Sequence, residues 1–221
     1  THGIMPLPLS RNMPPLPADS IPGAGYIPGI ARLNIPALKE TDASLGVSYA
    51  MGLRKDGATA LPSGVAMAST WSPDIMYRGG AMIGSEARAK GFNVLLAGGG
   101  NLIRDPRNGR TFEYLSEDPL LSGVLVGSAI SGIQSNNIIS TIKHFAFNGQ
   151  ETGRKFVDAK IGEAAARESD LLAFQIGIEK GRPGAVMCAY NRVHGAQACS
   201  SHWLLNKVLK KDWDYRGFVM S

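Results

Sequence analysis

The stretch IISTIKHFAF, residues 138–147, places a lysine and a histidine directly after a run of apolar and β-branched residues. A short run of this kind is typical of a buried strand. Lys143 and His144 then lie at or near the carboxyl end of that strand. Because neighbouring side chains of a strand point to opposite faces, both reach one pocket only where the strand turns into a loop. The stretch therefore predicts a strand that delivers polar side chains to its carboxyl end.

Strand-like and helix-like segments alternate along the rest of the chain. We expect further strands at 35–42, 93–99, 184–190 and 217–221, and helices at about 73–90, 119–136, 162–180 and 202–212. In the third helix Glu163 lies four residues before Arg167, and Gly181 and Pro183 follow as stop signals. A repeated strand–helix–strand order predicts an α/β fold with a parallel sheet and helices outside it.

Two α/β architectures fit this order, a doubly wound sheet and a (β/α) barrel of the TIM type. Asp42, Lys143, His144 and Tyr190 all fall at or near the carboxyl ends of expected strands. That end of a barrel is where charged residues from several strands converge. The polar residues therefore favour the barrel.

Proline is concentrated near the N-terminus, with eight of the 13 prolines between Pro6 and Pro36. Proline restricts φ and lacks a backbone donor, so we expect residues 1–22 to form an extended segment. The barrel domain is expected to occupy residues 23–221.

Composition narrows the class of protein. The 221 residues are 44% hydrophobic and 19% charged, as in globular proteins, and the net charge of +5 is thinly spread. The longest basic cluster is Lys210-Lys211, which argues against a nucleic-acid partner. No apolar stretch approaches the roughly 20 residues that span a bilayer, so we expect no membrane partner. No signal peptide is visible at Thr1, so secretion would require a segment already removed.

Sequence signatures of a cofactor are also missing. The four histidines, at positions 2, 144, 194 and 202, lack the spacing of metal ligands. AGGGNLI at 97–103 lacks the residues that define a phosphate-binding loop. We expect neither a metal nor another cofactor.

Two loops concentrate polar side chains after expected strands. Asn148, Gln150 and Glu151 precede Arg154 in the first. The second, residues 101–123, carries charges that cannot all be buried unpaired, so some must form ion pairs that shape the loop. Arg110, next to a glycine, can instead point its planar guanidinium into a cleft and bind hydroxyls or a carboxylate.

The chain has two cysteines, Cys188 and Cys199. Their spacing permits a disulfide, but two small buried thiols fit the same spacing. The residues alone leave both possibilities open.

Four motifs carry a resemblance to a known family: KHFAFNGQETGR, MCAYNRVHGAQAC, NLIRDPRNGRTFEYLSEDPLLSG and WDYRGFVMS. They resemble glycoside hydrolase family 3, in particular its β-glucosidase and β-xylosidase branch, and the likeness covers about Gly23 to Ser221. The resemblance implies a (β/α)8 barrel that is incomplete here, without its final strands and without the family's second α/β sandwich domain.

In that family an aspartate nucleophile follows the strand that GFVMS resembles, and the general acid/base comes from the later domain. We therefore expect no catalytic residue in this chain. It would be the N-terminal portion of a retaining, exo-acting β-glycosidase of the β-glucosidase type, inactive without a second polypeptide or the remainder of the same protein. The expected substrate is a β-glucoside or oligosaccharide, and the family implies a periplasmic or secreted location.

Substrate-binding roles carry over residue by residue from the resemblance. Asp42 would accept hydrogen bonds from sugar hydroxyls far from the bond that is cut, and Arg110 would donate to the same part of the sugar. Lys143 and His144 would bind neighbouring hydroxyls. Charged hydrogen bonds in a dry pocket are strong, and several must tighten as the ring approaches an oxocarbenium ion.

Further positions complete the expected site. Arg154 would lie behind these groups and steady the nucleophile, while Met187 and Tyr190 would line the sugar ring. The resemblance also favours a disulfide between Cys188 and Cys199.

Three residues depart from the family's usual pattern. They are Gly98, His194 and Asp214, in place of proline, asparagine and glycine. We expect all three in turns, with adjusted loops and unchanged chemistry.

Three other functions remain open from the sequence. The first is a β-xylosidase of the same family. The second is a non-catalytic sugar-binding barrel fragment that keeps Asp42, Arg110, Lys143 and His144. The third is a Schiff-base lyase that uses Lys143 as its nucleophile.

Overall fold

The computed structural model describes residues 17–48 and 54–221. Residues 1–16 of the expected proline-rich segment lie outside this part, so the predicted boundary after residue 22 stays a prediction.

In the described part of the chain, the main sheet has six strands in the order β1-β2-β3-β4-β6-β9. The first pair is antiparallel and the others are parallel. The strands are β1 (Gly25–Ile27), β2 (Leu38–Asp42), β3 (Val94–Leu96), β4 (Ile139–Phe145), β6 (Ala185–Cys188) and β9 (Phe218–Met220).

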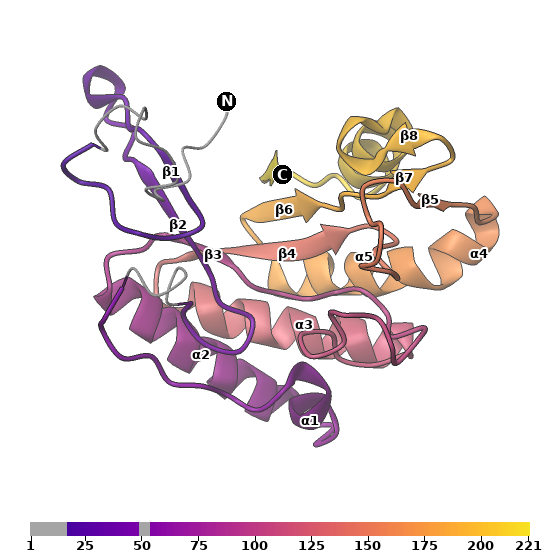
Figure 1. Cartoon of the computed structure of the whole chain (residues 1–221), viewed down its shortest axis with the longest axis horizontal. Helices are drawn as coiled ribbons and strands as arrows, with labels where there is room; N and C mark the ends of the chain where they lie inside the picture. The colour runs from indigo at the N-terminus through magenta and orange to yellow at the C-terminus, as the bar shows by residue number, and fades with distance from the viewer. Residues whose placement is uncertain (1–16, 49–53) are drawn as a thin grey trace.

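Three long helices lie in the connections between the parallel strands from β2 to β6 and cover one face of the sheet (Figure 1). They are α2 (Pro73–Ala89), α3 (Pro119–Gln134) and α5 (Asp170–Gly181). The result is an α/β fold with a curled half-barrel sheet, as the strand–helix–strand order predicts.

Local sequence explains where two of these helices begin. Ser72 precedes α2 and its Oγ accepts from the backbone N–H of Ile75 at 3.3 Å. Asp118 precedes α3 and its carboxylate accepts from the backbone N–H of Leu121 at 2.6 Å. Each cap satisfies a backbone donor that the first turn leaves free, and a proline at the first helical position needs no such partner.

Glycines allow α2 and α3 to pack closely. A Cβ added at Gly80 would lie 2.1 Å from the carbonyl oxygen of Ala129, and one at Gly132 would lie 2.1 Å from that of Tyr77. No side chain fits at these distances, so the two helix backbones meet at glycine on both sides.

The predicted helix at 162–180 is wrong in its continuity, because two helices occupy this stretch. These are α4 (Glu163–Glu168) and α5, separated by Ser169, whose φ of −126° and ψ of −105° are not helical. The Ser169 hydroxyl donates to the carbonyl oxygen of Ala165 at 2.6 Å. A serine side chain that bonds to its own backbone competes with the helix ladder in this way.

Short elements complete the fold. A small sheet has the strand order β5-β7-β8, and short helices lie before α2 and after β8. Their bounds are β5 (Asp158–Ala159), β7 (Arg192–Val193), β8 (Ala196–Gln197), α1 (Gly64–Ala68), η1 (Ala31–Leu33), η2 (Ala198–Ser200) and the π-helical η3 (Trp203–Asp212).

The main core fills the space between the sheet and its helices. Phe145 of β4 is fully buried and contacts Phe174 of α5 edge-on, with ring centroids 5.3 Å apart. Trp213 packs against the same ring at 5.8 Å. Buried aromatic pairs of this geometry add to the hydrophobic stabilisation of the core.

Turns and one covalent link hold the connecting loops. Gly98, His194 and Asp214 have positive φ values of 124°, 51° and 50°. His194 lies in the turn between β7 and β8, as expected, but Gly98 does not lie in a turn, because it lies just after β3 and its carbonyl oxygen accepts from the backbone N–H of Lys143 in β4. Cys188 and Cys199 form a disulfide that joins the end of β6 to η2, with Cα atoms 5.3 Å apart. Among the described residues, no helix is long and apolar enough to cross a membrane.

Candidate active site

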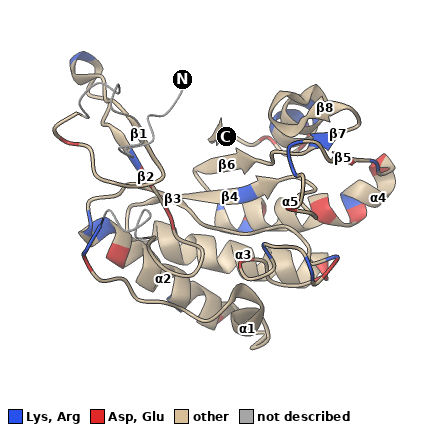
Figure 2. Cartoon of the chain, in the orientation of Figure 1, with Lys and Arg blue, Asp and Glu red and all other residues tan. Residues whose placement is uncertain are grey.

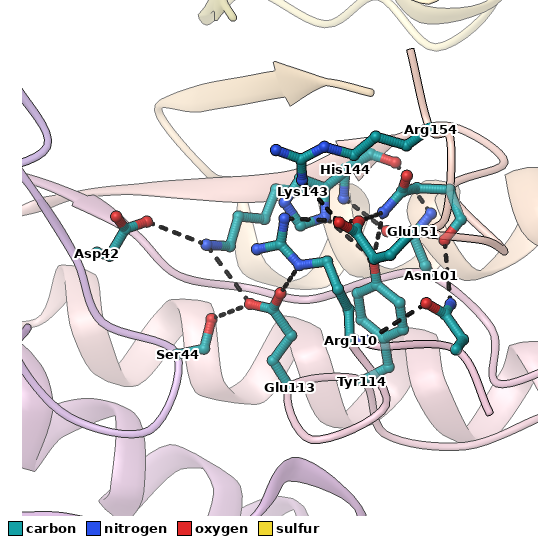
Figure 3. Close-up of polar contacts among 12 residues, drawn as sticks. Asp42, Ser44, Asn101, Arg110, Glu113, Tyr114, Lys143, His144, Glu151 and Arg154 are labelled. Carbon is teal, nitrogen blue, oxygen red and sulfur yellow. Dashed lines mark hydrogen bonds and ion pairs between the residues drawn. The ribbon is translucent and has the colours of Figure 1, made fainter. Parts of the chain in front are cut away.

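Functional side chains gather at the carboxyl end of the parallel sheet. Asp42 ends β2, Lys143 and His144 lie in β4, and Tyr190 follows β6. Figure 2 shows a basic segment inside β4, where Lys143 lies. The loop after β3 adds further polar groups, and Figure 3 shows them pointing toward one another.

Lys143 lies at the centre of this cluster. Its ammonium group is 3.5 Å from Asp42 Oδ1 and 3.5 Å from Glu113 Oε2. The side chains of Lys143 and Glu113 are 3% and 2% exposed, whereas that of Asp42 is 59% exposed. The ammonium therefore joins a buried carboxylate to one that is open to a ligand.

Besides its ion pair with Lys143, Glu113 accepts hydrogen bonds from two side chains. Ser44 Oγ donates to it at 2.6 Å, and Arg110 Nε donates to its other oxygen. Burial alone would raise the pKa of Glu113, but the charges of Lys143 and Arg110 outweigh it. The pKa of Glu113 therefore lies below its ordinary value, and the side chain acts as a fixed anion that orients its cationic neighbours.

A second carboxylate, Glu151, joins two arginines. Arg154 NH1 lies 2.8 Å from Glu151 Oε2, and Arg110 NH1 lies 3.8 Å from Glu151 Oε1. The guanidinium of Arg154 also stacks over the ring of Tyr190, 4.6 Å from its centroid. Such a cation–π contact fixes the plane of the arginine and ties the loop after β4 to the loop after β6.

His144 is buried and held on two sides. Its backbone N–H donates to Asn101 Oδ1 at 2.6 Å, and its Nδ1 lies 3.1 Å from the hydroxyl of Tyr114. Burial, and after it the positive charges of Lys143 and Arg110, hold the pKa of His144 well below its usual range. The imidazole is therefore neutral at physiological pH.

Lys143 and His144 both serve this cluster although they are neighbours in a strand. The pairing of β4 with β6 shifts its register between Ile142 and Phe145, the segment that contains both residues. A register irregularity re-aims side chains that a regular strand would send to opposite faces. The condition that the strand must depart from regular geometry is thus met inside β4, before the loop begins.

Contacts connect most of the residues that the sequence nominated. Six of them, Asp42, Arg110, Lys143, His144, Arg154 and Tyr190, lie in one network linked through Glu113, Tyr114, Asn148 and Glu151. Met187 lies in β6, the strand beside β4, and pairs with Met220 of β9.

Two side chains have a central role in this network that the sequence did not predict. Glu113 was expected to form loop-shaping ion pairs, and it does so with Arg110, but its contact with Lys143 was not foreseen. Tyr114 was not nominated at all. Their position in a polar loop between a buried strand and a helix start was the available signal.

The cluster is suited to a polyhydroxylated ligand. It offers a carboxylate acceptor at Asp42, cationic donors at Lys143 and Arg110, and a neutral imidazole at His144. Charge-assisted hydrogen bonds of this kind are short, strong and directional. Across residues 17–48 and 54–221, no group of three or more histidine, cysteine or acidic side chains could hold a metal ion.

A half-barrel with clustered polar side chains at the carboxyl ends of its strands belongs to the (β/α)-barrel class. Residues 29–221 match the N-terminal domain of glycosyl hydrolase family 3. The match covers most of the chain, and the chain belongs to this family.

Curated relatives are glycosidases of more than one kind. Thermostable beta-glucosidase B of Acetivibrio thermocellus is 39% identical over 202 residues, which are 87% of this chain and 26% of the relative. Exo-alpha-(1->6)-L-arabinopyranosidase of Bifidobacterium longum is 35% identical over 206 residues, 90% of this chain and 27% of the relative. The chain thus spans about a quarter of the length of these proteins.

Solved structures agree with the fold. Beta-glucosidase 3B of Thermotoga neapolitana in complex with glucose has a TM-score of 0.85 and 39% identity, over 90% of this chain and 28% of that one. DesR, a beta-glucosidase of Streptomyces venezuelae in complex with D-glucose, also has a TM-score of 0.85 and 39% identity, over 90% and 25%.

Proposed function

We propose that this chain supplies the sugar-binding part of the active site of a retaining, exo-acting β-glycosidase that removes terminal β-D-glucosyl residues. The observation that carries the proposal is the buried ammonium of Lys143 between Asp42 and Glu113, next to the neutral His144. Relatives named as beta-glucosidases, and a related structure in complex with glucose, support it.

Each binding residue has a physical role in this proposal. Asp42, the most exposed of the charged groups around Lys143, accepts from sugar hydroxyls. Lys143 and Arg110 donate to hydroxyl oxygens, and Glu113 keeps both cations in place. Bonds that tighten as the sugar ring flattens lower the barrier, because they stabilise the transition state more than the bound substrate.

Bond cleavage in a retaining glycosidase needs two carboxyl groups roughly 5–5.5 Å apart. In our proposal both come from parts of the protein beyond these 221 residues, because the family resemblance implies a nucleophile aspartate after the strand GFVMS and a general acid/base in a later domain. The chain binds and orients the sugar, and the remainder of the protein performs the displacement.

Hydrolysis of 4-nitrophenyl β-D-glucoside tests this division. The 221-residue chain alone should show no turnover above background, whereas a protein that joins it to the remainder typical of its relatives should release glucose. NMR of the first product should show β-glucose. Turnover by the chain alone would contradict the division of labour, and α-glucose as first product would contradict retention.

The second candidate function is the removal of a different terminal sugar, a pentose, because one relative is an arabinopyranosidase. The longer protein should have a higher kcat/KM for 4-nitrophenyl β-D-glucoside than for the matching β-xyloside or α-L-arabinopyranoside. The reverse order would assign the site to a pentose.

A non-catalytic sugar-binding module is the remaining alternative for this cluster. Calorimetry with glucose separates it from the enzyme, since a module binds the sugar as tightly alone as within the longer protein, whereas the enzyme should gain affinity when the remainder is present.

The disulfide supports one further part of the proposal, a periplasmic or secreted location. Disulfides persist in oxidising compartments and are rare in the cytosol. Location is tested by fractionating cells and probing each fraction with an antibody to the chain.

A further inference from the structure

A buried chain of hydrogen bonds leads from Glu151 to His144. Asn148 Nδ2 lies 2.9 Å from Glu151 Oε1 and 2.9 Å from the Tyr114 hydroxyl. That hydroxyl lies 3.1 Å from His144 Nδ1. Asn148, Tyr114 and His144 are all buried, so bulk water does not compete for these bonds.

The donor and the acceptor of each hydrogen bond in this series follow from its first member, Glu151. The Glu151 carboxylate faces the guanidinium groups of Arg154 and Arg110 and accepts hydrogen bonds. The group of Asn148 that faces Glu151 must then be the amide nitrogen, which has two hydrogens and no lone pair to offer. One hydrogen serves Glu151 and the other serves the oxygen of Tyr114.

The Tyr114 oxygen therefore already accepts, and its own proton is left to donate. Of the described residues, His144 Nδ1 is the remaining partner of this hydroxyl. Burial raises the pKa of Tyr114, which keeps the phenol protonated, and burial lowers the pKa of His144, which leaves one proton on its ring. If Nδ1 accepts, that single proton must lie on Nε2.

We propose that Tyr114 and Asn148 are positioning residues that hold His144 in the Nε2–H tautomer, so that His144 acts as a hydrogen-bond donor to an oxygen of the bound ligand. That the ligand is a sugar rests on the proposed function; the tautomer does not. Within the described residues, Nε2 is buried and has no hydrogen-bond partner. A buried donor left without an acceptor is costly, so a ligand hydroxyl oxygen that reaches it gains a strong bond.

The tautomer of His144 matters because it decides whether Nε2 offers the ligand a hydrogen-bond donor or an acceptor. With its proton on Nε2, His144 joins Lys143 and Arg110 as a donor, and Asp42 is the exposed acceptor of the cluster. With its proton on Nδ1, the same ring would offer a lone pair at Nε2 and would accept a hydrogen bond from a ligand hydroxyl. Tyr114 and Asn148 thus select whether the ligand oxygen at the imidazole accepts a hydrogen bond or donates one.

Two-bond ¹H–¹⁵N correlation spectra of the ¹⁵N-labelled chain read the tautomer directly. In the unmodified protein at pH 7 we expect His144 to show a protonated Nε2 and an unprotonated Nδ1, together with a slowly exchanging hydroxyl proton of Tyr114. A protonated Nδ1 would overturn the proposal without any variant being needed.

Two substitutions change the chain of bonds in opposite ways. Tyr114→Phe removes the donor to Nδ1, so His144 should populate both tautomers. Asn148→Asp replaces the amide donor by a carboxyl oxygen that accepts from Tyr114; the hydroxyl then turns away from His144, and the ring proton should move to Nδ1. The same tautomer in Asn148→Asp as in the unmodified chain would contradict the role of Asn148.

Tyr215→Phe is the matched control. Tyr215 is also buried, and its hydroxyl donates to the carbonyl oxygen of Pro183 at 3.0 Å, in a different part of the core. This variant loses a comparable hydrogen bond but should leave the His144 spectrum unchanged. A tautomer change as large as that of Tyr114→Phe would show a general effect of core disruption. It would refute the proposal that Tyr114 and Asn148 hold the tautomer of His144.

Titration with glucose tests donation to a ligand. The Nε2–H resonance of His144 should move on saturation, and Asn148→Asp should weaken the apparent Kd about tenfold, the effect of losing one good hydrogen bond. Glucose that shifts the signals of Asp42 and Lys143 but not of His144 would refute the donor role alone. If glucose shifts no signal, both the proposed function and the hydrogen bond from His144 to the ligand are contradicted. The tautomer spectra still test separately whether Tyr114 and Asn148 hold His144 in the Nε2–H form.

Discussion

At the scale of single residues, Lys143 shows how the site trades stability for function. Taking an ammonium out of water is costly unless charges and hydrogen bonds compensate it, and here Glu113 and Asp42 do so from opposite sides. Removing the ammonium leaves Glu113 buried with its bonds to Arg110 and Ser44 alone. The buried carboxylate, with less compensation for its charge, then destabilises the folded state.

Lys143→Met should therefore destabilise the protein although methionine fills a similar volume. We expect the free energy of unfolding in urea to fall by about 2–3 kcal/mol, less than for a fully orphaned charge because Arg110 remains. Lys39→Met is the control: its ion pair with Asp19, at 3.6 Å, is partly exposed and should contribute much less to stability. Equal losses in the two variants would show that burial of the Lys143 pair is unimportant.

His144 should make the protein less stable in mild acid. Its pKa is well below 6.5 in the folded state because it is buried beside cations, whereas the unfolded chain titrates near 6.5. Below pH 6.5 the unfolded state binds a proton that the folded state does not, so stability is lost as the pH falls, with a limiting slope of about 1.4 kcal/mol per pH unit.

Urea unfolding at several pH values between 7 and 5, for the unmodified protein and for His144→Gln, measures this slope. The unmodified protein should lose more stability over this range than the variant. Parallel curves would mean that His144 titrates equally in both states. Glu113, whose pKa is lowered, acts in the same direction but nearer to pH 4.5 and below.

A residue of the site could be predicted when the sequence immediately around it marks its position. Asp42, Lys143 and Tyr190 follow apolar runs, so their place at strand ends is visible in the sequence. The partnership of Glu113 with Lys143 joins residues 30 positions apart in the chain, in a loop and a strand. Nothing in the local pattern distinguishes such a carboxylate from one that only shapes its loop.

At the scale of elements, the contact between α2 and α3 depends on the absence of side chains. Gly132→Ala places a Cβ 2.1 Å from the carbonyl oxygen of Tyr77, a rigid backbone atom, so the helices must move apart. We expect a loss of about 1–3 kcal/mol in thermal or urea unfolding, although alanine is the better helix former.

Gly162→Ala is the control for that substitution. Gly162 precedes α4 with φ of −65°, and an added Cβ would meet no atom within 4 Å. Its stability should change by no more than about 0.5 kcal/mol. A similar loss at both positions would show that the effect does not come from the contact between α2 and α3.

The disulfide gives a second prediction at this scale. It closes a loop with a sequence separation of 11 between β6 and η2, for which chain entropy predicts about 3 kcal/mol of stabilisation. Dithiothreitol should therefore lower the Tm of the unmodified protein and should have no effect on a Cys188→Ala/Cys199→Ala variant. An unchanged Tm on reduction would show that the bridge does not stabilise this loop.

The elements themselves were largely visible in the sequence, because their apolar runs are long and their ends carry caps and stop signals. The parallel strands and the helices α2 and α3 begin or end within a few residues of their predicted bounds. The break at Ser169 was not foreseen, since a serine alone does not end a helix. The two- and three-residue strands β1, β5, β7 and β8 are too short for a periodic pattern, and their pairing is set by tertiary contacts.

At the scale of the whole molecule, the site lies where four segments distant in sequence converge. Side chains after β2, β3 and β6 meet those of β4, and salt bridges link the loops into one charged network. A sheet whose strands are parallel brings all their carboxyl ends to one edge, so the topology alone assembles the cluster. The chain spans about a quarter of the length of its relatives, and the proposed function assigns the activity to a longer protein.

In that longer protein, Asp42→Asn should reduce kcat/KM for 4-nitrophenyl β-D-glucoside by about 10- to 100-fold. Asparagine keeps the shape of the side chain but loses the charge, and a hydrogen bond to a charged group contributes about 1.5–3 kcal/mol. Because such bonds strengthen as the ring becomes cationic, most of the loss should fall on kcat. Asp19→Asn, which alters a carboxylate paired with Lys39 and Tyr26 instead, should leave kcat/KM unchanged. A rise in KM with unchanged kcat would mean that Asp42 holds the substrate equally in its ground and transition states, and equal activity in both variants would remove Asp42 from the sugar site.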